Sequence, residues 1–201
     1  MSVVIFIIIL LKYSPYENMS NDYSDLEYLS VYLPVVITDH HEAEYESQYA
    51  YVVNNQLCDY PNKQFSGAGI TWQVCRAIED LYYNNDHSVS TSLLDLCACG
   101  VISDMMDSRE LETKAVANLG IANLENKFLK NMAEAHKYSI DKMNGLNYLS
   151  WAFYITPYIN CCFRSGTQEE LEFVVRALLD DCCCQKVSSS KRGHKGEEVY
   201  W

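Results

Sequence analysis

The strongest constraint on the fold is a run of nine consecutive apolar residues, Val3 to Leu11, most of them β-branched. A helix that crosses a bilayer needs about 20 such residues, so the run predicts no membrane association. A secretory signal core is the alternative, but no Lys or Arg precedes the run and no A-x-A-like cleavage site follows it. A continuous rather than alternating β-branched run favours a strand covered on both faces, as in a central parallel sheet.

The next segments extend this sheet. Apolar, β-branched residues predict strands at Leu33 to Thr38 and at Tyr51 to Asn55, and a weakly helical pattern lies between the first two strands at Asp22 to Leu29. A right-handed strand–helix–strand unit places the carboxyl ends of both strands at one edge of the sheet, where α/β proteins bind ligands. The residues that follow Thr38 are therefore the first candidates for a site.

The rest of the chain is predominantly helical by periodicity, with Ser66 as the N-cap of the first helix after the strands. Small side chains at Ala98 and Gly100 predict close backbone packing. Further helices are predicted at Ser92–Cys99, at Arg109–Leu119 with Asp107 or Ser108 as the cap, at Glu125–Met143 and at Gln168–Cys183. The predicted class is α/β, a parallel sheet flanked by helices with a helical subdomain. Residues 1–181 form the domain, 1–91 being its α/β part and 92–181 its mainly helical part, and 182–201 form a linker or flexible tail.

Charge and cysteine content limit the functional classes. The formal net charge of −12 disfavours general affinity for a polyanion unless a metal or a local basic patch reverses the field. The nine cysteines include no C-x2-C pair, so neither a zinc site nor a redox motif is indicated. An odd number of cysteines with adjacent thiols favours a reducing, cytoplasmic location.

The most informative stretch runs from Val35 to Glu42, Val-Val-Ile-Thr-Asp-His-His-Glu. It places Asp39, His40 and His41, all possible metal or phosphate ligands, at the carboxyl end of a buried strand. Adjacent side chains normally point to opposite faces of a strand, but where the chain turns both histidines can face one crevice. A surface histidine pair at a strand end is the alternative, and spacing alone does not distinguish the two.

This stretch resembles the third motif of the DHH phosphoesterases, and the chain as a whole resembles their RecJ branch, the single-strand-specific DNA exonucleases. Later segments resemble further family motifs in the same order. They are Phe65–Ile70, similar to the Gly-rich start of the helix after the DHH turn; Leu94–Asp104, similar to the fourth motif; and Thr156–Arg164, similar to the P-R-I-N-A-x-G-R segment. Several ordered motifs are far more specific than one tripeptide.

The resemblance implies a role for each matched residue. His40 and Asp104 would ligate one Mn2+ or Mg2+ of a two-metal site, and Asp39 would orient a histidine ring. His41 would donate to the scissile phosphate, and Asn160 and Arg164 would bind phosphate oxygens. These residue types suit a hard divalent cation and an anionic substrate.

The departures from the family pattern concern the metal ligands. The first motif, D-x-D-A-D-G, occurs nowhere in the sequence. In the second motif Glu17 stands where the family has a bridging Asp, and Met19 stands where it has Gly. In the P-R-I-N segment Tyr158 replaces Arg and Phe163 replaces Gly.

The leading hypothesis is a RecJ-like fragment that hydrolyses phosphodiester bonds in single-stranded DNA, weakly or not at all as this chain alone. One alternative is a degenerate, non-catalytic DHH domain, or half of a split enzyme whose partner chain supplies the first motif. A further alternative is a phosphodiesterase for short oligonucleotides or cyclic dinucleotides. Homo-oligomers are also expected, because an unpaired edge on the strand Val3–Leu11 would recruit another chain.

Overall fold

The computed structural model describes residues 27–28, 30–32, 34–42, 47–179, 186–188, 196 and 198–200. The strand predicted over Val3–Leu11 and the predicted ligand Glu17 lie outside the described residues. Of the helix predicted over Asp22–Leu29, only Glu27 and Tyr28 are described, and both are helical.

A small parallel sheet forms the α/β part of the described structure. Strand β1 (Val36–Asp39) pairs with β2 (Tyr51–Asn54), and Asp39 lies opposite Asn54 at their carboxyl ends. The Ile37 side chain is buried, as is that of Val35 just before the strand. The predicted mixed class with a parallel sheet is confirmed, and β1 extends to Asp39 rather than ending at Thr38.

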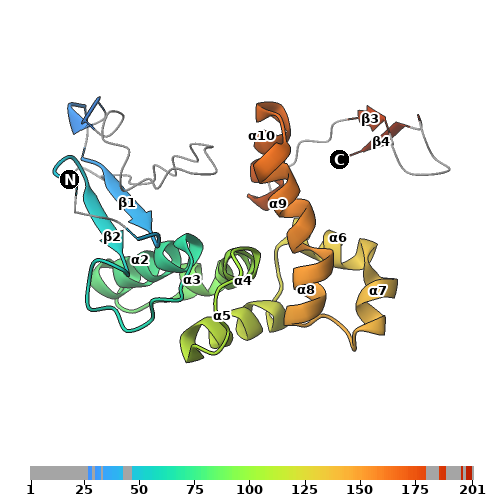
Figure 1. The fold of residues 1–201 in the computed structure, drawn as a ribbon, viewed down its shortest axis with the longest axis horizontal. Coiled ribbons are helices and arrows are strands. Elements are labelled where there is room, and N and C mark those ends of the chain that lie inside the picture. The colour runs from blue at the N-terminus through green and yellow to red at the C-terminus, as the bar shows by residue number, and fades with distance from the viewer. Residues whose placement is uncertain are drawn as a thin grey trace.

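Helices make up most of the remaining structure, with α2 packed beside β1 and the later helices extending away from the sheet (Figure 1). They are α2 (Gly67–Tyr82), α3 (Ser88–Ser92), α4 (Leu94–Ser103), α5 (Leu111–Ala122), α6 (Lys127–Ala135), α7 (Lys137–Lys142), α8 (Tyr148–Tyr154), α9 (Thr156–Ser165) and α10 (Gln168–Leu178). The Ser66 hydroxyl accepts from the Gly69 backbone N–H at 3.3 Å, which confirms the predicted N-cap of α2.

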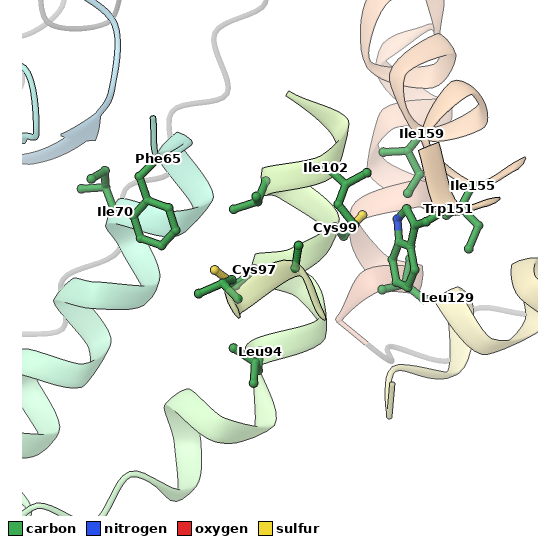
Figure 2. Close-up of a cluster of buried hydrophobic side chains, with 13 residues drawn as sticks. Phe65, Ile70, Leu94, Cys97, Cys99, Ile102, Leu129, Trp151, Ile155 and Ile159 are labelled. Atoms are coloured by element: carbon green, nitrogen blue, oxygen red, sulfur yellow. The ribbon is translucent and has the colours of Figure 1, made fainter. Parts of the chain in front are cut away.

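Helix α4 lies at the centre of the hydrophobic core. Its buried side chains face α2 on one side and α8 and α9 on the other (Figure 2). Phe65 and Trp151, from these opposite sides, are both fully buried. Burial of each such side chain contributes about 1.5–3 kcal/mol to folding. Because one core includes both parts, the predicted boundary near residue 91 does not separate two cores.

Small residues let α4 approach its neighbours closely. A Cβ atom added to Gly100 would overlap the Cβ of Ala68 in α2, and one added to Gly120 of α5 would lie 2.5 Å from the Leu94 carbonyl oxygen. Ala98 of α4 is completely buried at the α5 contact. The close packing predicted at Ala98 and Gly100 is therefore confirmed.

Two predicted helix starts are wrong. The segment predicted as one helix over Ser92–Cys99 belongs to α3 up to Ser92 and to α4 from Leu94 to Ser103. Helix α5 begins at Leu111 with Glu110 as its N-cap, not at Arg109. Asp107 does not cap α5, because its carboxylate accepts from the Arg109 backbone N–H at 2.9 Å and pairs with the Arg109 guanidinium.

Two predicted helices also have different bounds in the structure. The pattern over 125–143 is divided into α6 and α7 at His136, whose backbone leaves the helical region and whose ring packs against Tyr154 and Tyr158. Helix α10 ends at Leu178, and the predicted helix beyond residue 179 lies outside the described residues. The start of α10 carries a capping box between Thr167 and Glu170.

Within the segment predicted as a linker or tail, β3 (Lys186–Ser188) pairs antiparallel with β4 (Glu198–Tyr200). In the described part of the chain, no helix has both the length and the apolar character needed to cross a membrane.

Candidate active site

The turn after β1 is organised by the buried carboxylate of Asp39. One oxygen, Oδ1, accepts from the backbone N–H groups of His40 at 2.7 Å and His41 at 3.2 Å, and lies 2.7 Å from His41 Nδ1. An ionised carboxylate only accepts, so Nδ1 of His41 carries the hydrogen. The two histidine rings lie beside each other, with centroids 4.3 Å apart. The local turn therefore directs both histidines to one side of the strand end, as the sequence predicts.

Asp104 is brought to this turn by the end of α4. Its Oδ2 lies 3.0 Å from His40 Nε2, although the two residues are far apart in the sequence. The His40 side chain is only 13% exposed, and its ring packs over Gly67, the first residue of α2. The predicted convergence of His40 and Asp104 is thus present in the structure.

The end of α4 is fixed in place by α9. Asn160 Nδ2 donates to the Ser103 carbonyl at 3.0 Å, directly before Asp104. The Ser103 hydroxyl in turn contacts the Thr156 hydroxyl at 3.4 Å. Arg164 follows Asn160 by four residues, on the same face of α9, and its positive charge acts on Asp104. The contact that the structure gives Asn160 is with backbone, and its binding to a phosphate stays a prediction.

The charges of the site shift two pKa values in opposite directions. Burial alone would raise the pKa of Asp104, but the hydrogen bond from His40 and the charges of His40, His41 and Arg164 lower it on balance. The hydrogen bond to Asp39 raises the pKa of His41 above its usual value against the opposing effect of burial, and the charge of Asp104 adds to the increase. The site therefore pairs an ionised carboxylate with a histidine that readily holds a proton.

The donor atoms of His40 and Asp104 suit a divalent cation. Two ligands bound about 2.1 Å from one octahedral ion, at right angles, lie about 3.0 Å apart, which is the separation of His40 Nε2 and Asp104 Oδ2. Within the residues that the structure covers, no group of three or more His, Cys, Asp or Glu side chains is arranged to hold a metal ion. The described donor set therefore fits one cation incompletely.

Two further residues position the turn, and sequence reasoning missed both. Asn54 is buried at the end of β2 and donates from Nδ2 to the His41 carbonyl at 2.9 Å. Gln56 donates from Nε2 to the His40 carbonyl at 3.2 Å, and its backbone N–H donates to Asn54 Oδ1. The available signal was the polar run Asn54-Asn55-Gln56 at the end of the strand predicted over Tyr51–Asn55.

The two family departures in α9 make contacts other than those of Asn160. Phe163 packs against the hydrophobic core. Tyr158 is 52% exposed and packs against the His136 ring at 4.8 Å. Around a helix of 3.6 residues per turn, Tyr158 points away from the Asn160 face. Both replacements therefore leave the contacts of Asn160 in place.

Comparison with known proteins identifies relatives. The chain is 35% identical over 166 residues to YorK, an SPbeta prophage protein of Bacillus subtilis (strain 168) named as a single-strand DNA-specific exonuclease. The yorK protein of Bacillus phage SPbeta gives the same identity. RecJ of Bacillus subtilis (strain 168), named single-stranded-DNA-specific exonuclease, is 28% identical over 152 residues.

These matches cover much of this chain and a minor part of each relative. The YorK match spans 82% of the chain and 28% of YorK, and the RecJ match spans 74% of the chain and 18% of RecJ. No protein-family model matches the sequence, and no solved structure matches it significantly.

Proposed function

The chain is a RecJ-like member of the DHH phosphoesterase superfamily, and from this we propose that its site acts on phosphodiester bonds of single-stranded DNA with a bound Mn2+ or Mg2+. The observation that carries the proposal is the contact of His40 Nε2 with Asp104 Oδ2, which joins two separate sequence motifs at one point. The names of the relatives support single-stranded DNA over short oligonucleotides or cyclic dinucleotides as the substrate.

His40 and Asp104 would hold the cation, with Glu17 as a further predicted ligand. Bound there, a divalent cation supplies Lewis-acid polarisation of a phosphate oxygen and lowers the pKa of a coordinated water. Asp104 is suited to this role because its carboxylate is kept ionised by the neighbouring histidines and Arg164.

His41 would donate a hydrogen bond to the phosphate. Its Nδ1 is held by Asp39, so Nε2 is the nitrogen that the ring can offer to a substrate oxygen. The ring is 60% exposed, which leaves space for a ligand. Asp39 fixes the orientation of the ring, and Arg164 would add a planar guanidinium for the remaining phosphate oxygens.

We propose further that these 201 residues alone hydrolyse DNA weakly or not at all. Two-metal catalysis needs both cations held, and the sequence contains no D-x-D-A-D-G motif to supply the first pair of carboxylates. His40 and Asp104, the two ligands that match the family pattern, cannot hold two cations. The missing motif is also the reason for the second candidate, a non-catalytic domain or half of a split enzyme completed by a partner chain.

The test measures release of nucleotides from labelled single-stranded DNA with Mn2+, with and without EDTA. The 201-residue chain should release little. Adding a segment that bears D-x-D-A-D-G, fused or as a separate chain, should produce cleavage that EDTA abolishes. His40→Ala and Asp104→Ala should each remove it, because each deletes a cation ligand.

A matched control is His136→Ala, which changes a half-buried histidine outside the site. It should leave the restored cleavage unchanged. A second readout is Mn2+ binding by titration calorimetry, which should be lost in His40→Ala. Strong, EDTA-sensitive turnover by the chain alone would contradict the proposed incompleteness, and persistence of Mn2+ binding in His40→Ala would contradict the proposed ligand set.

A further inference from the structure

An exposed apolar strip runs along α8 and α9. Leu149 and Phe153 are 58% and 64% exposed, and Pro157 is exposed one turn further on. The two helices are joined by Ile155, whose backbone is right-handed helical and donates to the Trp151 carbonyl at 2.9 Å. The i, i+4, i+8 spacing therefore places the three side chains in one line, here called the apolar strip.

The apolar strip leads to the candidate active site. Phe153 in α8 and Arg164 in α9 are eleven residues apart in the sequence, a spacing of about three helical turns. Two other side chains of α8 and α9 form hydrogen bonds with backbone carbonyls near Asp104 in the sequence. Tyr148 donates to the Met106 carbonyl at 3.4 Å, and Asn160 donates to the Ser103 carbonyl at 3.0 Å.

A further exposed apolar side chain lies next to Asp104 in the sequence. Met105 directly follows Asp104, has a positive φ of 56°, and is 73% exposed. Exposed apolar side chains therefore occur beside Asp104 as well as on α8 and α9. Exposed apolar side chains grouped beside a polar site are typical of a binding surface.

The local charge of this region differs from that of the whole chain. No Asp or Glu occurs between Asp141 and Glu169, and Arg164 is the one charged residue from 143 to 168. The chain as a whole carries 27 acidic residues. A polyanion that is repelled by the acidic residues elsewhere in the chain would therefore meet no acidic side chain of α8 or α9 between the apolar strip and Arg164.

We propose that Phe153 and the apolar strip form a base-stacking surface for single-stranded DNA whose backbone is bound at Arg164. A single strand offers unpaired base faces that can stack on an exposed aromatic ring, whereas the bases of a duplex are already stacked on each other. Phe153 lies about three helical turns, roughly 16 Å along the helices, from Arg164, a distance that a few nucleotides of a single strand can span. This inference rests on the proposed function, and it assigns the part of the substrate that lies beyond the reacting phosphate.

The test uses fluorescence anisotropy with a labelled single-stranded oligothymidylate in EDTA, so that no cleavage occurs. Phe153→Ala should weaken binding by about 5- to 150-fold, the range for loss of one stacked base. Phe153→Trp should retain binding because it keeps an aromatic face. Tyr82→Ala, which removes a 77% exposed aromatic ring at the end of α2, is the matched control and should bind like the unaltered chain.

A second substrate separates stacking from other effects of the substitution. An oligonucleotide with abasic positions should bind the unaltered chain as weakly as Phe153→Ala binds the normal oligonucleotide, and Phe153→Ala should cause no further loss on it. Equal loss on both substrates would overturn the inference. So would self-association of the chain that disappears in Phe153→Ala without a change in DNA binding, because the strip would then be a contact between copies.

Failure of this inference is distinguishable from failure of the proposed function. If Mn2+ binding depends on His40 and the DNA is bound but Phe153→Ala does not weaken that binding, only the stacking surface is wrong. If Mn2+ binding does not depend on His40, the proposed site is wrong, whatever the result at Phe153.

Discussion

At the scale of single residues, Asn54 shows how the second strand supports the site on the first. It is 2% exposed, donates to the His41 carbonyl and accepts from the Gln56 N–H at 2.8 Å. The buried amide therefore fixes the backbone that carries the second histidine.

We expect Asn54→Ala to destabilise the fold and to weaken Mn2+ binding at His40. It removes the hydrogen bonds to the His41 carbonyl and from the Gln56 N–H, at a cost of about 0.5–1.5 kcal/mol for each bond. Urea unfolding and calorimetric Mn2+ titration measure the two effects. Asn131→Ala, on the exposed side of α6, is the control and should change neither. Normal Mn2+ affinity in a folded Asn54→Ala protein would show that the turn holds its shape without this support.

Glu79 illustrates a different use of a carboxylate, as the cap of another helix. It is buried, and its Oε1 accepts from the Val89 and Ser90 N–H groups at the start of α3 at 2.9 and 3.0 Å. Burial acts to raise the pKa of Glu79, but these hydrogen bonds and the neighbouring His87 lower it on balance.

This pKa predicts a pH dependence of stability. A carboxylate whose pKa is lower in the folded than in the unfolded state stabilises the fold above the unfolded value, about 4.3 for Glu. That stabilisation is lost as the pH falls through the folded value. Urea unfolding of the unaltered chain and of Glu79→Gln should therefore differ by a constant free energy from pH 7 to about 5, and the difference should shrink below about 4. A difference that persists undiminished to pH 3 would contradict the shift.

At the scale of elements, the contact between α4 and α5 depends on the missing side chain of Gly120. A Cβ atom there would lie 2.5 Å from the Leu94 carbonyl oxygen, and this backbone atom cannot move aside as a flexible side chain could.

We expect Gly120→Ala to destabilise the protein by about 1–3 kcal/mol through overpacking. This exceeds the roughly 1 kcal/mol that Ala gains over Gly in a helix. The comparison is Gly67→Ala, whose Cβ would make an ordinary 3.6 Å contact with His40. Thermal or urea unfolding should show a loss for Gly120→Ala and little change for Gly67→Ala. A stabilised Gly120→Ala would mean that α5 can shift away from α4 at little cost.

Elements defined by local signals were predictable from the sequence. The strands β1 and β2 were each predicted from an apolar, β-branched run, and the start of α2 was predicted from the side chain of Ser66. The boundaries at Glu110 and His136 were not predictable. Asp107 is a favourable N-cap by residue type, but its carboxylate accepts hydrogen bonds from Arg109 instead. The helix break at His136 depends on the packing of its ring against residues about 20 positions away in the sequence.

In the candidate site, too, some residues were predictable from local sequence signals and others depend on the folded chain. Asp39, His40, His41 and Asp104 were identified because they lie in motifs, and the motifs also placed Asn160 and Arg164 beside them. The roles of Asn54 and Gln56 depend on which residue lies opposite Asp39 in the sheet. That register is a property of the folded chain, and no local pattern reports it.

At the scale of the whole molecule, α4 joins the two parts of the chain. Its side chains complete the core between α2 and α8–α9, and the residue that follows its last turn is Asp104. The predicted metal ligand Asp104 thus directly follows the helix that has the most buried residues of those the structure describes.

This placement has a genetic consequence. A random-mutagenesis selection for loss of function would recover substitutions at Ala98, Val101 and Ile102 as often as substitutions at the site, because a displaced α4 carries Asp104 away from His40. Such positions would map as apparent active-site residues although their side chains never meet the substrate. Second-site suppressors of these substitutions should then arise across the core, in α2 and α8, rather than around the histidines.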